Sequence, residues 1–254
     1  MSDFIWVEKY RPTTIDECIL PKSIKKTFQD FVDRGEIPNM LLSGPPGIGK
    51  TTVAKALCNQ LGADYYVING SDEGRFLDTV RTNAKNFAST VSLTSESKHK
   101  VIIIDEADNT TSDVQLLLRA SIEEFSKNCR FIFTCNYKNK IIDPLHSRCT
   151  VVDFSINKKD KPTIAAQFFS RLTNILEQEK IDTDKKVVAQ LINQHFPDWR
   201  RVLNECQRYS VSGKIDSGIL AVFSDVAVND LIKSLKEKNF SEVRKWVVAN
   251  LDND

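Results

Sequence analysis

The sequence predicts an α/β fold in which a parallel sheet is flanked by helices, followed by a smaller helical domain. A phosphate-binding loop pattern joins a buried strand to a helix within residues 39–52. Two further runs, Val101 to Ile104 and Arg130 to Cys135, are apolar without alternation, as in parallel strands that are covered on both faces. Beyond residue 157 only helical periodicity recurs.

The loop from Gly44 to Thr51 fills every fixed position of the P-loop pattern. Its glycines allow successive backbone N–H groups to turn toward phosphate oxygens. Lys50 supplies a positive charge for the β- and γ-phosphates, and Thr51 supplies a hydroxyl for Mg²⁺. The helix expected from Lys50 to Leu61 directs its positive end at the same oxygens. The predicted nucleotide-binding residues of the loop are Gly44, Pro45, Pro46, Gly47, Ile48, Gly49, Lys50, Thr51 and Thr52.

Acidic residues follow the strand that ends at Ile104, at the sheet edge where open α/β folds bind ligands. Neighbouring side chains at a strand end point in different directions. We therefore expect Asp105 to hold Mg²⁺ together with Thr51, and Glu106 to orient and polarise the attacking water. Asn136 ends the next strand, so its amide is expected to contact the γ-phosphate and the water; a turn-forming Asn is the alternative. These residues predict an enzyme that hydrolyses ATP with Mg²⁺.

The stretch from Trp6 to Pro12 is apolar and aromatic, and Pro12 prevents a simple helix across it. Such a segment can pack beside an adenine ring, so Val7, Tyr10 and Arg11 are candidate base-binding residues. The alternative is that the segment only anchors the chain to the core.

Composition limits the function classes. Lys plus Arg total 35 against 34 acidic residues, and a net charge of +1 gives no overall attraction to nucleic acid or membrane. The longest apolar run, Ile219 to Phe223, is too short to span a membrane. No signal peptide pattern opens the chain, so we expect a cytoplasmic protein, in the host cytoplasm if it is viral. The six cysteines include no Cys-x-x-Cys pair, which argues against a zinc site.

Periodicity predicts the remaining elements in chain order. In the first part these are a helix at Pro21 to Arg34, a strand at Tyr65 to Ile68, helices at Arg75 to Ala88 and Ser112 to Phe125, and a strand at Val151 to Phe154. In the second part, helical patterns begin near Ile164, Val187 and Trp199, and no strand pattern returns before Gly218. The polar stretch 157–162 between them resembles a linker.

Six segments resemble the AAA+ ATPase subunits of sliding-clamp loaders of the replication factor C type, and the bacteriophage members of that family most. They are Trp6 to Pro12, Gly44 to Thr51, Asn69 to Asp72, Asp105 to Asp108, Ser147 to Cys149 and Asp198 to Arg201. The Ser-Arg-Cys triplet is the most diagnostic, because many ATPases share the P-loop and the Asp-Glu pair. The resemblance implies a RecA-like ATPase domain over 1–156, a helical lid domain over 157–226 and the incomplete beginning of a C-terminal collar over 227–254.

The resemblance also implies roles for particular residues. Arg148 would be an arginine finger in the ATP site of a neighbouring subunit, and Arg200 would contact the γ-phosphate from the lid. Since a finger adds about 10³ to 10⁵ to the hydrolysis rate, an isolated chain would hydrolyse ATP poorly. The implied DNA-binding residues are Arg75, Arg81, Lys85, Ser112 and Gln115. A solvated helix face is the alternative explanation for the charges among them.

The implied function is that of a clamp-loader subunit in DNA replication. ATP binding would assemble a pentameric spiral of like and unlike subunits that holds a ring-shaped sliding clamp open, and hydrolysis would release the clamp on primer–template DNA. One alternative is a related AAA+ motor for branch migration or helicase loading. Another is a small-molecule kinase, which would lack an arginine acting between chains. A non-hydrolysing structural subunit is disfavoured, because Lys50, Thr51, Asp105 and Glu106 are all present.

Overall fold

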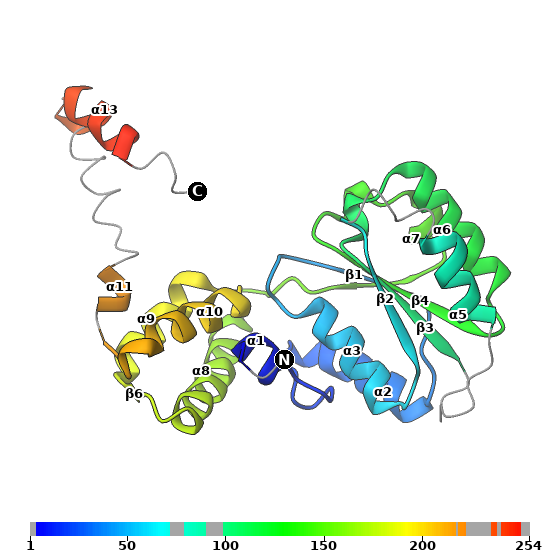
Figure 1. The fold of residues 1–254 in the computed structure, drawn as a ribbon, viewed down its shortest axis with the longest axis horizontal. Coiled ribbons are helices and arrows are strands. Elements are labelled where there is room, and N and C mark those ends of the chain that lie inside the picture. The colour runs from blue at the N-terminus through cyan, green and yellow to red at the C-terminus, as the bar shows by residue number, and fades with distance from the viewer. Residues whose placement is uncertain are drawn as a thin grey trace.

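The computed structural model describes residues 4–71, 79–89, 99–216, 218–221, 235–237 and 240–249. The first part of the chain is an α/β domain with helices on both faces of a sheet, and the second part is a group of helices beside it (Figure 1). None of the helices in these ranges is both long enough and apolar enough to cross a membrane.

The central sheet contains five parallel strands in the described part of the chain, in the order β2-β3-β4-β1-β5. Their bounds are Met40–Ser43 for β1, Tyr65–Asn69 for β2, Lys100–Asp105 for β3, Cys129–Cys135 for β4 and Thr150–Asp153 for β5. Because the strands are parallel, the loops that follow β1, β3 and β4 leave the same edge of the sheet. The predicted parallel sheet is confirmed, and this edge is where its polar residues gather.

Successive side chains along each strand point to opposite faces of the sheet, and they fill two cores, one on each face. Met40 and Leu42 pack under α2 and α3, whereas Leu41, between them, packs on the opposite face under α6 and α7. Every residue of β1 is buried. The bounds of the flanking helices are Lys22–Arg34 for α2, Lys50–Gln60 for α3, Lys85–Ser89 for α5, Ser112–Glu124 for α6 and Asp143–His146 for α7. A π-helix at Thr79–Ala84 precedes α5, and the predicted start of that helix near Arg75 lies outside the described residues.

The helical domain has its own core, shared by α8 (Lys161–Gln178), α9 (Lys185–His195) and α10 (Trp199–Tyr209). Asp184 and Asp198 accept hydrogen bonds from N–H groups in the first turns of α9 and α10, at 2.8 Å and 3.0 Å. The expectation that strands do not return before Gly218 is wrong. β6 (Asp182–Thr183) pairs in parallel with β7 (Lys214–Ile215), and two-residue strands are too short to show a period of two.

Two short helices close the described chain, α11 (Gly218–Ala221) and α13 (Phe240–Ala249). Within the range proposed for a collar domain, 227–254, the structure describes 235–237 and 240–249.

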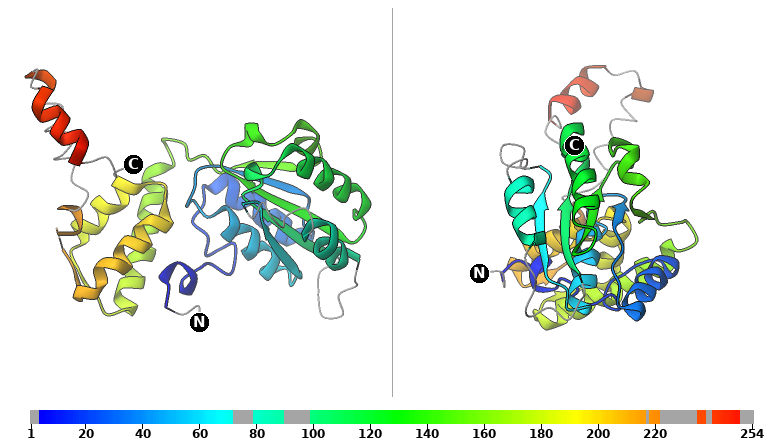
Figure 2. Two further views of the ribbon diagram at one scale, coloured as in Figure 1. Left: turned by 45° about the horizontal axis from the view of Figure 1, so that its top comes forward. Right: turned by 90° about the vertical axis from the view of Figure 1, so that its right-hand side faces the viewer.

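The N-terminal segment joins the two domains. It begins with a one-turn helix, α1 (Trp6–Lys9), which lies between the helical domain and the α/β domain in the left view of Figure 2. Trp6 is buried in the core of the helical domain, whereas Ile15 and Leu20 are buried in the core under α2 and α3. The chain therefore crosses from one domain to the other between residues 10 and 15.

Candidate nucleotide-binding site

The P-loop brings Lys50 to the polar edge of the sheet. Its side chain is 8% exposed, and its ammonium group donates to the carbonyls of Gly44 (2.7 Å) and Pro45 (2.8 Å) and to Oδ1 of Asn136 (2.8 Å). Burial lowers the pKa of Lys50, and the nearby carboxylates of Asp108 and Asp105 oppose that shift. A buried ammonium group that donates to three oxygen atoms is suited to triphosphate oxygens.

Thr51 and Asp105 meet as predicted. The Thr51 hydroxyl donates to Oδ1 of Asp105 at 2.5 Å, although the two residues are 54 positions apart. Thr134 on β4 donates to the same oxygen at 2.6 Å, and its hydroxyl also accepts the N–H of Glu106 at 3.0 Å. Thr134 thus orients both acidic residues, and sequence reasoning missed it. Its only sequence signal is its place on β4, two residues before Asn136.

The hydroxyl and carboxylate oxygens of Thr51 and Asp105 are ligands of the type that Mg²⁺ prefers. Within the described residues there is no cluster of three or more His, Cys, Asp or Glu side chains that could hold a metal. A magnesium ion does not need one, because it usually keeps several waters and is shared between one or two protein oxygens and substrate phosphates. The residues therefore fit a nucleotide-bound Mg²⁺.

Glu106 has a left-handed backbone conformation, with φ of 55°, at the end of β3. Its carboxylate accepts hydrogen bonds from the Ser71 hydroxyl and from Nδ2 of Asn109, the latter at 3.2 Å. Gly70 allows the chain before Ser71 to pass close to Glu106, because a Cβ at position 70 would lie 2.5 Å from the carbonyl oxygen of Glu106. Ser71 and Asn109 were not predicted as site residues, although Ser71 lies in one of the segments that carry the family resemblance.

Asp108 fixes the position of Asn136. It is 6% exposed, and its Oδ2 accepts the backbone N–H groups of Asn136 (3.1 Å) and Tyr137 (3.0 Å). The end of β4 is therefore tied to the turn after β3, and the Asn136 amide is directed at Lys50.

Two adjoining cavities meet at the P-loop. The polar one, about 450 Å³ and partly open to solvent, is lined by Pro46, Gly47, Gly49, Lys50, Thr51, Thr52, Asp105, Glu106, Thr134, Cys135, Asn136 and Arg200. The other is mainly apolar and encloses about 700 Å³, also partly open to solvent. Its lining includes Val7, Tyr10, Arg11, Ile48, Val53, Arg171, Trp199 and Leu203. The two share Gly47, Gly49, Thr52 and Arg200, so one elongated ligand with an apolar end and an anionic end can fill both.

These cavities bring most of the predicted nucleotide-binding residues together. Gly44 and Pro45 are outside the two linings, and they contribute the carbonyls that hold Lys50. Trp6 does not belong to the cavity wall among the described residues, because it is buried in the helical core. The anchoring alternative therefore applies to Trp6, while Val7, Tyr10 and Arg11 do line the apolar cavity.

The helical domain contacts the loop directly at the start of α10. Gly47 has φ of 72°, and a Cβ there would lie only 1.8 Å from Oδ1 of Asp198. Asp198 also caps α10, so the cap sits against the P-loop. Arg200, two residues further on, is exposed and lines both cavities.

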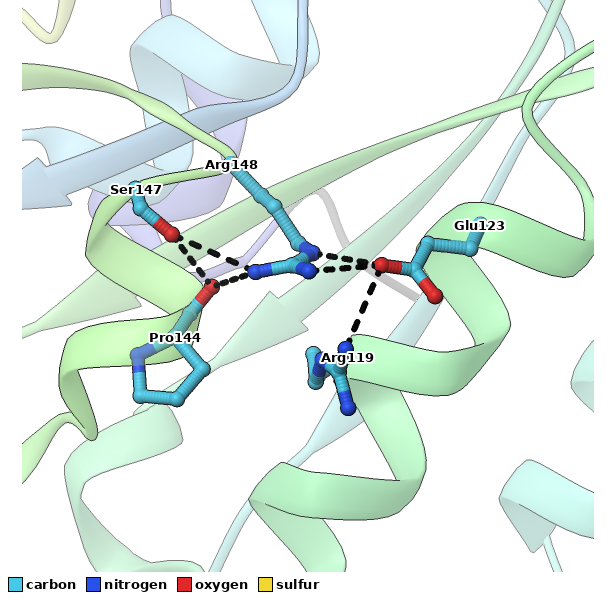
Figure 3. Close-up of polar contacts among 5 residues, drawn as sticks. All are labelled: Arg119, Glu123, Pro144, Ser147 and Arg148. Atoms are coloured by element: carbon cyan, nitrogen blue, oxygen red, sulfur yellow. Dashed lines mark hydrogen bonds and ion pairs between the residues drawn. The ribbon is translucent and has the colours of Figure 1, made fainter.

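Arg148 lies elsewhere on the surface, after α7, and is absent from the described residues that line either cavity. Figure 3 shows its guanidinium against Glu123 on α6: Nε and Nη2 donate to Oε1 of Glu123 at 2.9 Å and 2.6 Å. Nη1 donates to the carbonyl of Pro144 at 2.9 Å and to the Ser147 hydroxyl at 3.2 Å. These bonds lower the pKa of Glu123, and Arg119 adds a second positive charge 3.5 Å from the same oxygen.

The predicted DNA-binding residues differ in whether the structure describes them and in how exposed they are. Arg75 lies outside the described residues, and the Arg81 side chain is also undescribed. Lys85 is exposed, and its Nζ lies 3.4 Å from Oε1 of Glu124. Ser112 is exposed at the start of α6.

The predicted contact of Gln115 with DNA is wrong, because this residue is only 2% exposed. Its Nε2 donates to the carbonyls of Thr110 (3.3 Å) and Lys140 (3.1 Å), and its Oε1 accepts the N–H of Ile142 (2.9 Å). The side chain is fully engaged inside the protein, so we remove Gln115 from the DNA-contacting set.

Comparisons with known proteins support the same site. Residues 40–157 match the model of the ATPase family associated with various cellular activities (AAA), and residues 160–221 match that of the sliding-clamp-loader large subunit, AAA+ ATPase lid domain. The Holliday junction branch migration motor RuvB of Thermotoga maritima has a similar structure, with a TM-score of 0.61 at 21% identity, over 85% of this chain and 72% of that one. At this identity the likeness shows the fold alone.

Sequence relatives are closer. The sliding-clamp-loader large subunit of Enterobacteria phage T4 is 43% identical over 249 residues, and that of Escherichia phage RB69 is 42% identical; each alignment covers 96% of this chain and 77% of the relative. The replication factor C small subunit of Methanocella arvoryzae is 36% identical over 96% of this chain and 76% of its own length. Together with the site geometry, these matches show that the chain is an AAA+ ATPase that belongs to the family of sliding-clamp-loader subunits.

Proposed function

We propose that this clamp-loader subunit uses ATP to open a ring-shaped sliding clamp and to place it on primer–template DNA during replication. The main support for this proposal is that one charged side chain, Arg148, lies apart from the charged residues of the nucleotide cavity. Lys50, Asp105, Glu106 and Arg200 line one cavity, whereas Arg148 is held on a separate part of the surface. A site arranged in this way gains a further cation only when another chain supplies it.

Within one subunit the residues divide the work. The P-loop N–H groups and Lys50 bind the β- and γ-phosphates, and the base and ribose occupy the apolar cavity beside Tyr10. Thr51 and Asp105 would hold Mg²⁺, which would supply positive charge to neutralise the phosphates. Glu106 orients and polarises the attacking water, and Asn136 and Arg200 contact the γ-phosphate.

Between subunits, Arg148 acts in the ATP site of the neighbour. Four N–H···O contacts hold its guanidinium on its own chain, and phosphate oxygens of a neighbour would replace them. We place the subunit in a pentameric spiral of like and unlike chains that contacts the clamp. On the DNA-facing side, Arg75, Arg81, Lys85 and Ser112 stay proposed contacts to the DNA backbone. Because replicating DNA is the site of action, the proposed location is the cytoplasm, or the host cytoplasm for a phage protein.

The test measures ATP hydrolysis by the assembled loader with and without clamp and primed DNA. Arg148→Ala should abolish the stimulated rate, while the affinity of that chain for ATP changes less than about twofold, since the side chain lies outside its own cavities. Mixing Arg148→Ala chains, which keep an intact cavity, with Lys50→Ala chains, which keep the finger, should restore part of the rate.

Equal losses of binding and hydrolysis in Arg148→Ala, or no recovery in the mixture, would contradict a role in trans. Stimulation by duplex or junction DNA without any clamp would instead favour the related motor function.

A further inference from the structure

The apolar cavity has one wall that belongs to neither domain alone. This wall comes from the segment between Tyr10 and Leu20, several of whose residues line the cavity together with Ile48 and Val53. On the side of the α/β domain, Ile15, Cys18 and Leu20 are buried in the core under α2 and α3, and two hydrogen bonds add to this attachment. Nη1 of Arg11 donates to the Thr52 hydroxyl at 3.0 Å, and the N–H of Ile15 donates to Oε1 of Gln60 at 2.9 Å.

The helical domain holds the same segment through Arg171 on α8. Its Nη2 donates to the carbonyl of Tyr10 at 2.9 Å, and its Nη1 donates to the carbonyl of Glu17, also at 2.9 Å. One guanidinium therefore ties together two points of the wall that are seven residues apart. The planar fork of Arg can bond two acceptors at once, whereas the single ammonium group of Lys is a point donor.

Arg171 lies at the apolar cavity and not at the phosphates. It belongs to the lining of the apolar cavity, and in the described part of the chain it is absent from the lining of the polar one. The groups that surround the phosphate end, Lys50, Thr51 and Asp105, bond to one another and to the P-loop rather than to this wall. The two ends of the nucleotide site are therefore supported by different contacts.

We infer that Arg171 is a positioning residue for the base and ribose of the nucleotide. By holding the carbonyls of Tyr10 and Glu17, it keeps the wall at the distance that a flat purine needs for packing against Ile48 and Val53. The helical domain would then contribute to nucleotide affinity in two ways, through Arg200 at the phosphates and through Arg171 at the base. This inference deepens the proposed ATP site and does not depend on Arg148, on the clamp or on DNA.

The experiment compares two ligands by calorimetry in the presence of Mg²⁺: ATP, which fills both cavities, and inorganic tripolyphosphate, which fills only the polar one. The variants Arg171→Ala and Arg171→Lys should each weaken ATP binding by about 10- to 100-fold, since two hydrogen bonds from a charged group are lost or reduced. The affinity for tripolyphosphate should change less than about twofold. The matched control is Arg208→Ala, which removes another arginine of the helical domain, one that is paired with Glu205 at 2.6 Å.

Three outcomes would overturn the inference. Unchanged ATP affinity in both variants would show that the wall does not need Arg171. Equal weakening of ATP and tripolyphosphate would show a general effect of charge or domain placement. Full recovery of ATP affinity in Arg171→Lys would show that the positive charge matters rather than the two-point attachment. If Arg171→Ala does not fold, Arg171→Lys alone decides between these results, and its folding is checked by circular dichroism.

Discussion

Gly47→Ala tests how tightly the helical domain sits on the P-loop. Gly47 combines a left-handed φ of 72° with a neighbour that a methyl group cannot tolerate, since its Cβ would lie 1.8 Å from Oδ1 of Asp198. Asp198 must then move, and it would lose its hydrogen bond to the N–H of Arg201 at the start of α10. Gly35 is a matched control, because it has φ of 66° at the end of α2 and no atom within 4 Å of its added Cβ.

The expected magnitudes follow from these two geometries. A left-handed alanine costs about 1–2 kcal/mol, so Gly35→Ala should lower the free energy of unfolding by about that amount. Gly47→Ala carries the same cost plus the loss of a helix cap, about 0.5–2 kcal/mol more. The difference between the two variants therefore isolates the contact between the loop and the helical domain.

Urea unfolding followed by far-UV circular dichroism measures both variants, because helices of both domains, among them α2 and α10, contribute to that signal. The double variant Gly47→Ala with Asp198→Ala should cost less than the sum of the two single variants, since the cap can be lost only once. Additive costs, or a Gly47→Ala variant no less stable than Gly35→Ala, would refute the placement of Asp198 on the loop.

Three further predictions concern single side chains. Glu106→Gln should lower hydrolysis by at least about 10²-fold in a phosphate-release assay while ATP binding persists, because an amide cannot polarise water as a carboxylate does; a parallel loss of binding would contradict this role. Glu123→Gln should release Arg148 and raise the stimulated rate of the assembled loader by up to about fivefold, as expected for breaking an exposed ion pair, whereas a fall would mean that Glu123 aims the finger. Burial and the nearby Arg201 lower the pKa of His195 from 6.5, so its contribution to stability is complete above that pH and declines as the pH falls through it. His195→Gln should flatten the dependence of the urea midpoint on pH between 7 and 5, and an unchanged slope would assign the dependence to other groups.

Much of the site could be predicted because its chemistry is contiguous along the chain. Lys50 and Thr51 occupy adjacent positions of one loop, and Asp105 and Glu106 end a strand whose apolar composition shows that it is buried on both faces. Parallel strands bring their carboxyl ends to one edge, and the P-loop and acidic-pair motifs act on the same Mg²⁺, so the meeting of Thr51 with Asp105 could be predicted.

Other residues gave no such signal. Thr134 has the composition of an ordinary strand residue, and only the pairing of β3 with β4 brings it to both acidic residues. Gln115 is a polar residue near the start of a helix, where exposure is the ordinary expectation. Packing of α6 against the chain near Lys140 and Ile142 buries it instead.

The α/β class, the P-loop and the acidic strand end can be predicted from the sequence, because periodicity and short motifs act over a few neighbouring residues. The distant groups that contact those motifs are set by the folded arrangement. Arg171 reaches carbonyls 161 and 154 positions away, and Asp198 meets a loop that precedes it by some 150 residues. Such contacts depend on strand order and on how the helical domain lies against the loop, and no local pattern along the chain encodes either.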